Sequence, residues 1–283
     1  MTGKRIDIFW AFIIGGCLSV VAEAIWWIIV ATGLPVESWA VTVMLITFGV
    51  IGMILTYFNI MQKLVAKGGF GAFLPFMSLP CSIILDYTGA RHQGKSIGQS
   101  TAIGLKGPAF VFGTGVPVTA VICAITYFIK GKEGMIGQLM NAGQLEATPM
   151  SLPLYIKAFL VGGLICAIWQ IFFRWNKKSI TLNMAMGIYL GAILTALSVM
   201  EHIVGFAGRG MVLQIHNTGE GAYRWFSLIL LFGDISGFLR FLLMLAVLFI
   251  GGTVVFGELY YKKTLKTGPM GGPGAPGAPE GHE

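Results

Sequence analysis

The sequence is dominated by apolar stretches long enough to cross a bilayer as helices, which takes about 20 residues for about 30 Å of hydrocarbon. Most charged residues lie between these stretches, near their ends. A soluble domain cannot bury this much apolar sequence, because 55% of the residues are hydrophobic and only 11% are charged. A membrane β-barrel would instead show short alternating segments. The sequence therefore predicts an all-α, polytopic integral membrane protein with about six transmembrane helices.

The apolar stretches set the expected positions of these helices. We expect spans at about residues 8–32, 40–61, 101–129, 152–173, 182–203 and 237–260. The third span contains glycine and proline between Gly107 and Pro117, so we expect it to be kinked or unwound there.

Two further apolar segments, residues 67–86 and 206–221, are too rich in glycine or proline for a continuous helix. Irregular backbone at membrane depth is tolerated only where protein or a water-filled cavity surrounds it. We therefore expect re-entrant or broken elements at these two places. Close helix packing is the alternative reason for small residues in a membrane protein. The residues expected to form the breaks are Gly69, Gly71, Pro75, Pro80, Gly208 and Gly210.

An internal repeat relates the two halves of the chain. The segment Ala-Phe-Ile-Ile-Gly-Gly at residues 11–16 recurs as Ala-Phe-Leu-Val-Gly-Gly 147 positions later, which places Glu23 opposite Gln170. Farther along, the separation becomes 139 positions and aligns the two glycine-rich elements. With an odd number of spans in each half, the second half enters the membrane with the opposite polarity. This predicts an inverted-topology repeat.

The repeat also divides the chain. We expect a first membrane repeat at residues 8–129, a polar linker at 130–151 and a second membrane repeat at 152–261. The last segment, 262–283, is rich in glycine and proline, so we expect a disordered tail there.

The cationic residues indicate the orientation. In this layout most Lys and Arg residues fall on one side of the membrane, which the positive-inside rule makes the cytoplasmic side. Both termini and the tail are then cytoplasmic, in a multi-pass protein of the cell (inner) membrane. The linker lysines Lys130 and Lys132 depart from this rule.

Composition and motifs exclude several function classes. The net charge of +7 comes from residues beside apolar stretches and not from a continuous basic face, so we expect membrane lipids as partners and no nucleic acid. The four cysteines and four histidines show no metal-ligand spacing. No nucleophile elbow, catalytic triad or nucleotide-binding loop is present. We expect no enzyme activity, no metal and no cofactor.

The ionisable and polar residues inside the spans are the candidates for a transport pathway, because such residues are costly in the membrane and usually face protein or water. Glu23 and Lys106 are the stronger candidates, and Gln170 is the repeat counterpart of Glu23. Arg240 is the weaker one, since it can reach a lipid headgroup. Asp234 is expected to cap a helix that begins near Ser236.

One segment, YIKAFLVGGLICAIWQ at residues 155–170, resembles the opening helix of the stage V sporulation A (SpoVA) membrane proteins, particularly their AC and AE members. In those proteins a second helix and a glycine-rich Ala-Gly-x-Gly element follow, and residues 206–210 and 67–75 resemble that element. Residues 103–110 resemble the glycine-rich final helix of the family. Two such units in one chain would form a tandem duplicate, in contrast to the usual single unit.

The resemblance implies a spore inner-membrane assembly that passes dipicolinic acid, with calcium, during sporulation and germination. The leading hypothesis is a SpoVA-like channel or channel component for such a small anion, with Lys106 favoured as an anion contact. A structural membrane subunit that anchors a larger complex, or a secondary transporter, are the alternatives. We expect either a homo-oligomer or assembly with other membrane subunits.

Overall fold

A computed structural model describes residues 5–33, 41–74, 76–145, 151–176, 178–210 and 216–267. This part of the chain forms helices and contains no strands, which confirms the all-α prediction. The helices of the first half are α1 (Arg5–Ala31), α2 (Val41–Tyr57), α3 (Ile60–Gly68), α4 (Phe70–Phe73), α5 (Ser78–His92), α6 (Ile97–Gly104) and α7 (Lys106–Leu145). Those of the second half are α8 (Leu152–Asn176), α9 (Ile180–Ala196), α10 (Val199–Ala207), α11 (His216–Phe232), α12 (Ser236–Leu245), the π-helix Ala246–Gly251 and α13 (Gly252–Thr267).

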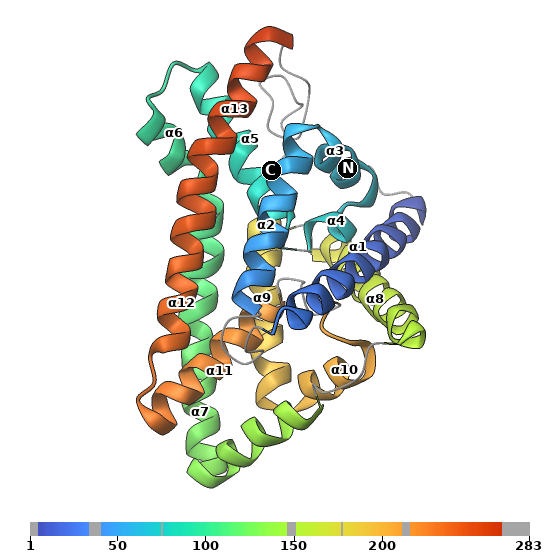
Figure 1. Cartoon of the computed structure of the whole chain (residues 1–283), viewed down its shortest axis with the longest axis vertical. Coiled ribbons are helices and arrows are strands. Elements are labelled where there is room, and N and C mark those ends of the chain that lie inside the picture. The colour runs from blue at the N-terminus through green and yellow to red at the C-terminus, as the bar shows by residue number, and fades with distance from the viewer. Residues whose placement is uncertain are drawn as a thin grey trace.

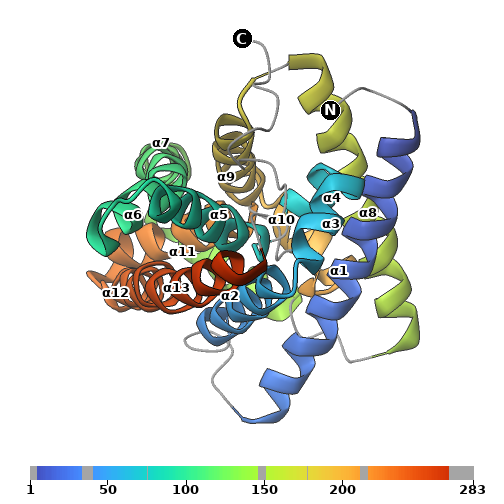
Figure 2. The same ribbon diagram turned by 90° about the horizontal axis from the view of Figure 1, so that it is seen from above.

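The described residues contain four to six candidate membrane spans. Four helical stretches are long and apolar enough alone, and two bent helix pairs, α2 with α3 and α9 with α10, bring the number to six if each pair is one span. In Figure 1, the long α7 and the α12–α13 helix lie at one side, whereas α1 and α8 lie at the other. From above, α2 and α9 lie between these two groups (Figure 2). The predicted polytopic membrane protein is confirmed.

The two bent pairs share one geometry. Each bends by 98°, at Asn59 in one and at Ser198 in the other, and these residues are 139 positions apart. Both adopt the left-handed helical conformation, with φ of 60°, in which no further helical turn can form. Lys263 of the second half donates to the Tyr57 carbonyl, and Lys130 of the first half donates to the Ala196 carbonyl. Carbonyls released by each bend are thus bonded by the opposite half.

Helices α1 and α8 cross at their glycine pairs. A Cβ atom on Gly16 would lie 2.7 Å from the carbonyl oxygen of Phe159, and one on Gly163 would lie 2.6 Å from that of Phe12. The Phe12 and Phe159 rings meet edge to face at 5.5 Å. Each contact is the mirror of the other in sequence, because the partners are 147 positions apart. Only glycine lets these two backbones approach so closely.

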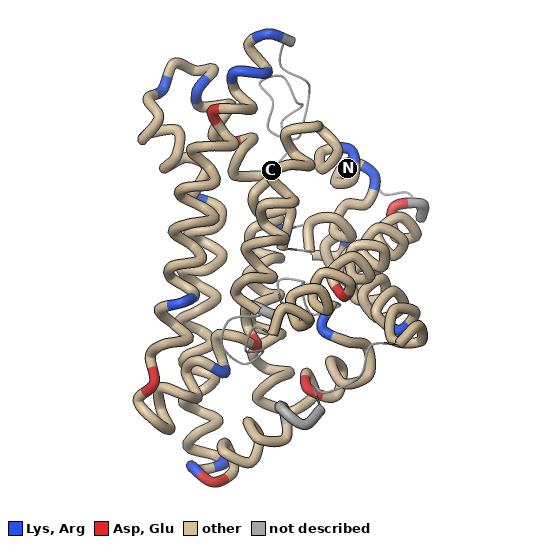
Figure 3. The backbone as a smooth tube through the Cα atoms, viewed as in Figure 1, with Lys and Arg blue, Asp and Glu red and all other residues tan. Residues whose placement is uncertain are grey.

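The two halves have opposite directions in the fold. Figure 1 shows that α7 runs from the end where α6 lies toward the opposite end, whereas α12 and α13 return the other way. The short helices α3 and α10 lie toward opposite ends of the molecule (Figure 1). Figure 3 shows many Lys and Arg residues where α6 and α13 lie, with acidic residues among them, and both signs of charge at the other end.

Three sequence-based expectations about local structure differ from the structure. The third span is not unwound between Gly107 and Pro117: α7 is helical there, and the breaks lie at Leu105 and at Gly131, which has φ of 70°. The linker 130–151 is helical as far as Leu145, and α13 continues to Thr267. Residues 268–283 of the expected tail lie outside the described residues.

The expected broken elements are present. Helix α3 ends at Gly68, four helical residues follow Gly69, and α5 begins at Ser78. Pro80 does not break a helix but lies in the first turn of α5, where a missing N–H costs little. Pro75 lies outside the described residues. In the second half, α10 ends at Ala207 and Gly208 has φ of 81°.

Candidate polar centre between the two halves

Glu23 is buried where α1 meets the broken element after α10. It is 1% exposed. Its Oε2 accepts a hydrogen bond from the Gly210 amide at 2.5 Å, and its Oε1 accepts one from Trp27 Nε1 at 2.8 Å. A Cβ atom on Gly208 would lie 2.5 Å from this carboxylate. The glycine therefore provides both the left-handed backbone and the space that Glu23 occupies.

Gln170 makes the matching contact with the first half. It is buried, and its Oε1 accepts a hydrogen bond from the Phe70 amide at 2.8 Å. A Cβ atom on Gly69, whose φ is 49°, would lie 2.5 Å from that oxygen. Each half thus supplies the acceptor that bonds the broken backbone of the other half, and Glu23 and Gln170 occupy equivalent places. An orphan amide at these buried positions would be costly.

Next to Glu23, the second half contains a buried network of charged side chains. The Glu220 carboxylate, 1% exposed, lies 3.1 Å from Arg209 Nη1 and 2.8 Å from Arg224 Nη2. Glu220 and Arg224 are one turn apart on α11, which places them on one helix face. Arg209 is also close enough to Glu23 to act on its charge. The arginines are the cations that make a buried carboxylate pair tolerable in the membrane.

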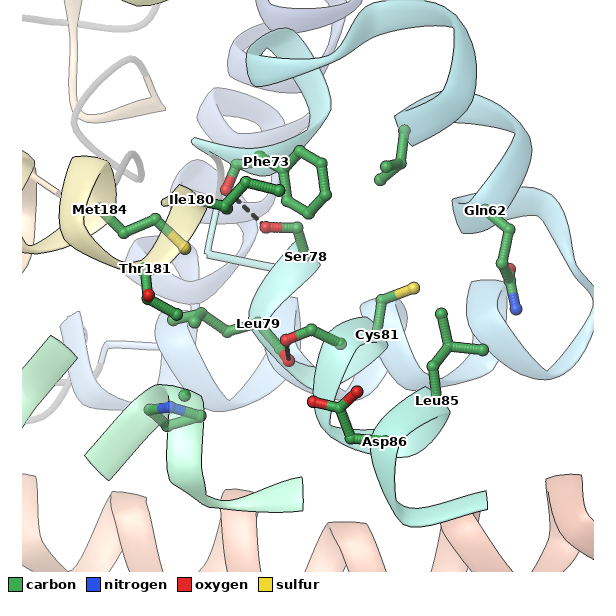
Figure 4. A pocket seen from close by; sticks show the side chains of 14 residues that line it. Gln62, Phe73, Ser78, Leu79, Cys81, Leu85, Asp86, Ile180, Thr181 and Met184 are labelled. Carbon is green, nitrogen blue, oxygen red and sulfur yellow. Dashed lines mark hydrogen bonds between the residues drawn. The ribbon is translucent and has the colours of Figure 1, made fainter. Parts of the chain in front are cut away.

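The first half lacks these charges. The positions 139 residues before Arg209, Glu220 and Arg224 are Phe70, Cys81 and Leu85. In their neighbourhood the structure contains a cavity of about 180 Å³ (Figure 4). Its lining residues come from α3, α5, the start of α7 and the start of α9, with Phe73 from α4. Ion pairs therefore occupy these positions in the second half, whereas a cavity lies beside the equivalent positions in the first half.

Two of the pathway residues expected from the sequence lie away from the Glu23 and Gln170 contacts. Lys106 is exposed at the first position of α7, beside Gly107 and Pro108, which line the cavity. Arg240 is partly buried on α12.

Asp234 lies one residue before Ile235, the N-cap residue of α12, and bonds the first amide of the helix. Asp234 Oδ1 accepts the Ser236 amide at 2.8 Å. This hydrogen bond lowers the pKa of Asp234, and the Arg240 charge adds to the effect. Arg240 thus lies near the end of its span and not at the polar centre.

Among the glycine positions, Gly69, Gly208 and Gly210 contact Gln170 or Glu23, as described above. Gly71 instead packs against the backbone of Ala11 on α1. Both readings of these glycines, broken backbone and close packing, therefore apply, but at different positions.

The ion-pair network of Arg209, Glu220 and Arg224 was not predicted as a unit from the sequence. The signal was available in the spacing of Glu220 and Arg224, four residues apart at the start of an apolar stretch, with Arg209 inside the glycine element. Asp86, which lines the cavity, was not predicted as a site residue either. No group of three or more His, Cys, Asp or Glu side chains placed to hold a metal occurs within the described ranges.

Comparison with known families gives a match over most of the chain. The model of the family described as SpoVAC/SpoVAEB sporulation membrane protein matches residues 7–129 and 154–223, one segment in each half. Neither the curated proteins nor the solved structures gave a significant match.

Proposed function

This chain belongs to the SpoVAC/SpoVAEB sporulation membrane protein family, and on this basis we propose that it passes a small anion across the membrane, as a channel or as one component of a channel. Dipicolinic acid, moving with calcium across the spore inner membrane, is the substrate that the family resemblance suggests. The two matched segments and the paired contacts of the halves support a tandem origin for the chain.

The observation that carries this proposal is the access to Arg224. Its side chain is 23% exposed, whereas its partner Glu220 is 1% exposed. A guanidinium binds carboxylates with two parallel hydrogen bonds, so a mobile dicarboxylate that reaches Arg224 would find a suitable partner. Exchange of Glu220 for a passing carboxylate would keep Arg224 paired, while the buried Glu220 would keep its ion pair with Arg209.

The broken elements favour an anion as well. Helices α5 and α11 both begin inside the protein, at the buried Ser78 and His216. The amino-terminal end of a helix carries a partial positive charge, which stabilises nearby anions. Two helix starts directed into the interior by inverted halves form the arrangement that transport proteins use for anionic groups.

Lys106 is a second proposed contact for the anion. Its exposed position next to the cavity at Gly107 and Pro108 suits a residue at the entrance of a path and not at its centre. We expect Lys106→Ala to lower the uptake or release rate through loss of local attraction, by about threefold to tenfold.

The proposed orientation places the end with α6 and α13 in the cytoplasm. Lys and Arg dominate that end (Figure 3), as the positive-inside rule requires. Both termini of the chain are then cytoplasmic.

A structural membrane subunit is the second candidate, since the ion pairs of Glu220 also tie Arg209 to α11 and would stabilise an anchor. A homo-oligomer or a complex with other membrane subunits is compatible with either role. Copurification with unrelated subunits and no flux by the isolated protein would favour the anchor. Saturable flux that depends on an ion gradient would favour a secondary transporter.

The test is the release of dipicolinate from vesicles that contain the purified full chain, detected outside by terbium luminescence. We expect release by the wild type, a loss of about tenfold or more in Arg224→Gln, and partial recovery in Arg224→Lys, which keeps the charge. Arg174→Gln is the matched control, because Arg174 pairs with Asp7 at 3.0 Å near the start of α1. Equal release from protein-free vesicles, or from wild type and Arg224→Gln, would contradict the proposal.

A further inference from the structure

The cavity between α3, α5 and α7 of the first half and α9 of the second half has the size of a ligand site. Its volume is about 180 Å³. A cavity of about 150 Å³ is large enough to hold a benzene molecule. One flat ring with a small substituent therefore fits. Phe73, Leu79, Met184 and other apolar side chains form most of the wall (Figure 4).

Several polar groups of this wall can accept hydrogen bonds. Ser82 donates its hydroxyl proton to the Leu79 carbonyl, so its oxygen retains acceptor capacity, and Ser78 donates its proton to the Phe73 carbonyl. Gln62 donates through Nε2 to the Thr56 carbonyl, while its buried Oε1 has no hydrogen-bond partner among the described residues. A ligand that satisfies this wall must bring N–H or O–H donors.

A carboxylate without a cation completes the wall. Asp86 lines the cavity with its carboxylate directed inward (Figure 4). Within the described ranges no basic side chain forms an ion pair with Asp86. Asp86 is itself exposed, so a cation can reach its carboxylate from outside the protein.

The other half shows what fills an equivalent site. There, the carboxylate of Glu220 is held by the planar guanidinium groups of Arg209 and Arg224. Their counterparts in the first half are Phe70 and Leu85, which supply no charge. The place of the Arg224 guanidinium in the second half thus corresponds to an unfilled space near the Asp86 carboxylate in the first half.

We infer that the cavity beside Asp86 binds one small, planar organic cation of the amidinium or guanidinium class, paired with the Asp86 carboxylate and with its apolar part between Phe73 and Met184. An organic cation fits better than a divalent metal, because no three metal-ligating His, Cys, Asp or Glu side chains gather anywhere in the described ranges. This inference stands independently of the proposed anion passage, and its test measures binding and not flux.

The test uses benzamidine as the probe and neutral benzamide as its isostere, with the full chain in detergent. We expect benzamidine to raise the melting temperature of the wild type at millimolar concentrations, and benzamide to bind about tenfold or more weakly. Asp86→Asn should weaken benzamidine binding by about tenfold or more, since it removes a charge-assisted hydrogen bond. Asp7→Asn, which alters a carboxylate outside the cavity, should leave the affinity unchanged.

A second variant guards against misfolding of Asp86→Asn. Leu85→Arg introduces a guanidinium at the position equivalent to Arg224, next to Asp86 in the sequence. We expect this variant to stay folded and to lose benzamidine binding, because the internal cation occupies the site. Equal binding of benzamidine and benzamide, unchanged affinity in both cavity variants, no effect of benzamidine up to about 10 mM, or displacement of benzamidine by calcium would each overturn the inference.

Discussion

The crossing of α1 and α8 provides the sharpest test of the packing between the two halves. The perturbation is one methyl group, added by Gly16→Ala or by Gly163→Ala. In each variant the new Cβ atom would lie 2.7 or 2.6 Å from a backbone carbonyl oxygen of the facing helix. Ordinary contact begins near 3.4 Å, so the helices must separate by about 0.7 Å.

The magnitude follows from two opposing terms. Forcing extra volume into a packed contact costs about 1–3 kcal/mol. Alanine is the better helix former, which returns up to about 1 kcal/mol. We therefore expect a net loss of about 1–2 kcal/mol in either variant, and similar values for both because their surroundings match.

The assay is the free energy of unfolding in mixed micelles, measured by circular dichroism as sodium dodecyl sulfate is added. Gly113→Ala is the matched control: it is helical, and its Cβ atom would meet no atom within 4 Å. This control should be unchanged or more stable by up to about 1 kcal/mol. If Gly16→Ala and Gly163→Ala were as stable as the control, the close crossing would be refuted.

Further predictions concern polar contacts and strained backbone, each measured by the same unfolding assay. Gln170→Leu should lose about 1–3 kcal/mol, because the buried Phe70 amide loses its acceptor, and Gln170→Glu, which retains an acceptor, should lose less. Ser198→Gly should gain about 1 kcal/mol by removing the cost of a side chain in the left-handed conformation, and no gain would contradict that strain. Glu258→Gln should lose at most about 1 kcal/mol, a loss that shrinks at high salt, because its ion pair with Arg91 is partly exposed. A larger loss that does not depend on salt would contradict this reading.

The parts of the fold that the sequence predicted are those set by composition and local pattern. Apolar length predicted the spans, and glycine with proline predicted the broken elements near Gly69 and Gly208. The repeat spacing of 147 positions predicted that Glu23 and Gln170 would be equivalent, and the later spacing of 139 positions aligned the glycine-rich elements. These features depend on a few neighbouring residues, so a single sequence contains them.

The wrong prediction concerned where α7 is interrupted, because the surroundings of a proline or glycine decide whether the helix breaks there. Helix α7 continues through Pro117. Pro117 has no N–H to donate to the Gly113 carbonyl, but Gly113 faces open space. The backbone there has room to adjust. The breaks fall instead at Leu105 and at Gly131, whose φ of 70° favours glycine.

The candidate site was predicted only in part. Glu23 and Gln170 were identified as candidates through the repeat. The sequence did not predict that each would accept a backbone hydrogen bond from the opposite half. The pairing of Arg209 with Glu220 joins a residue after α10 to a residue on α11, and a pattern on one helix does not reveal it. The cavity beside Asp86 lies where the first half has no counterpart of the Arg209 and Arg224 side chains, and only the folded structure shows this space.

The central claim is that the two halves lie inverted in the membrane, with their bent elements at opposite faces. Lys63 on α3 and His202 on α10 test it, because both are exposed and they are 139 positions apart. In a Cys17→Ser background, which removes the exposed cysteine among the four, each position is changed to cysteine and labelled in sealed cells with a membrane-impermeant maleimide. We predict that the cysteine at position 202 reacts from outside, while the one at 63 reacts only after the membrane is opened. Labelling of both cysteines from the same side would contradict the inverted arrangement.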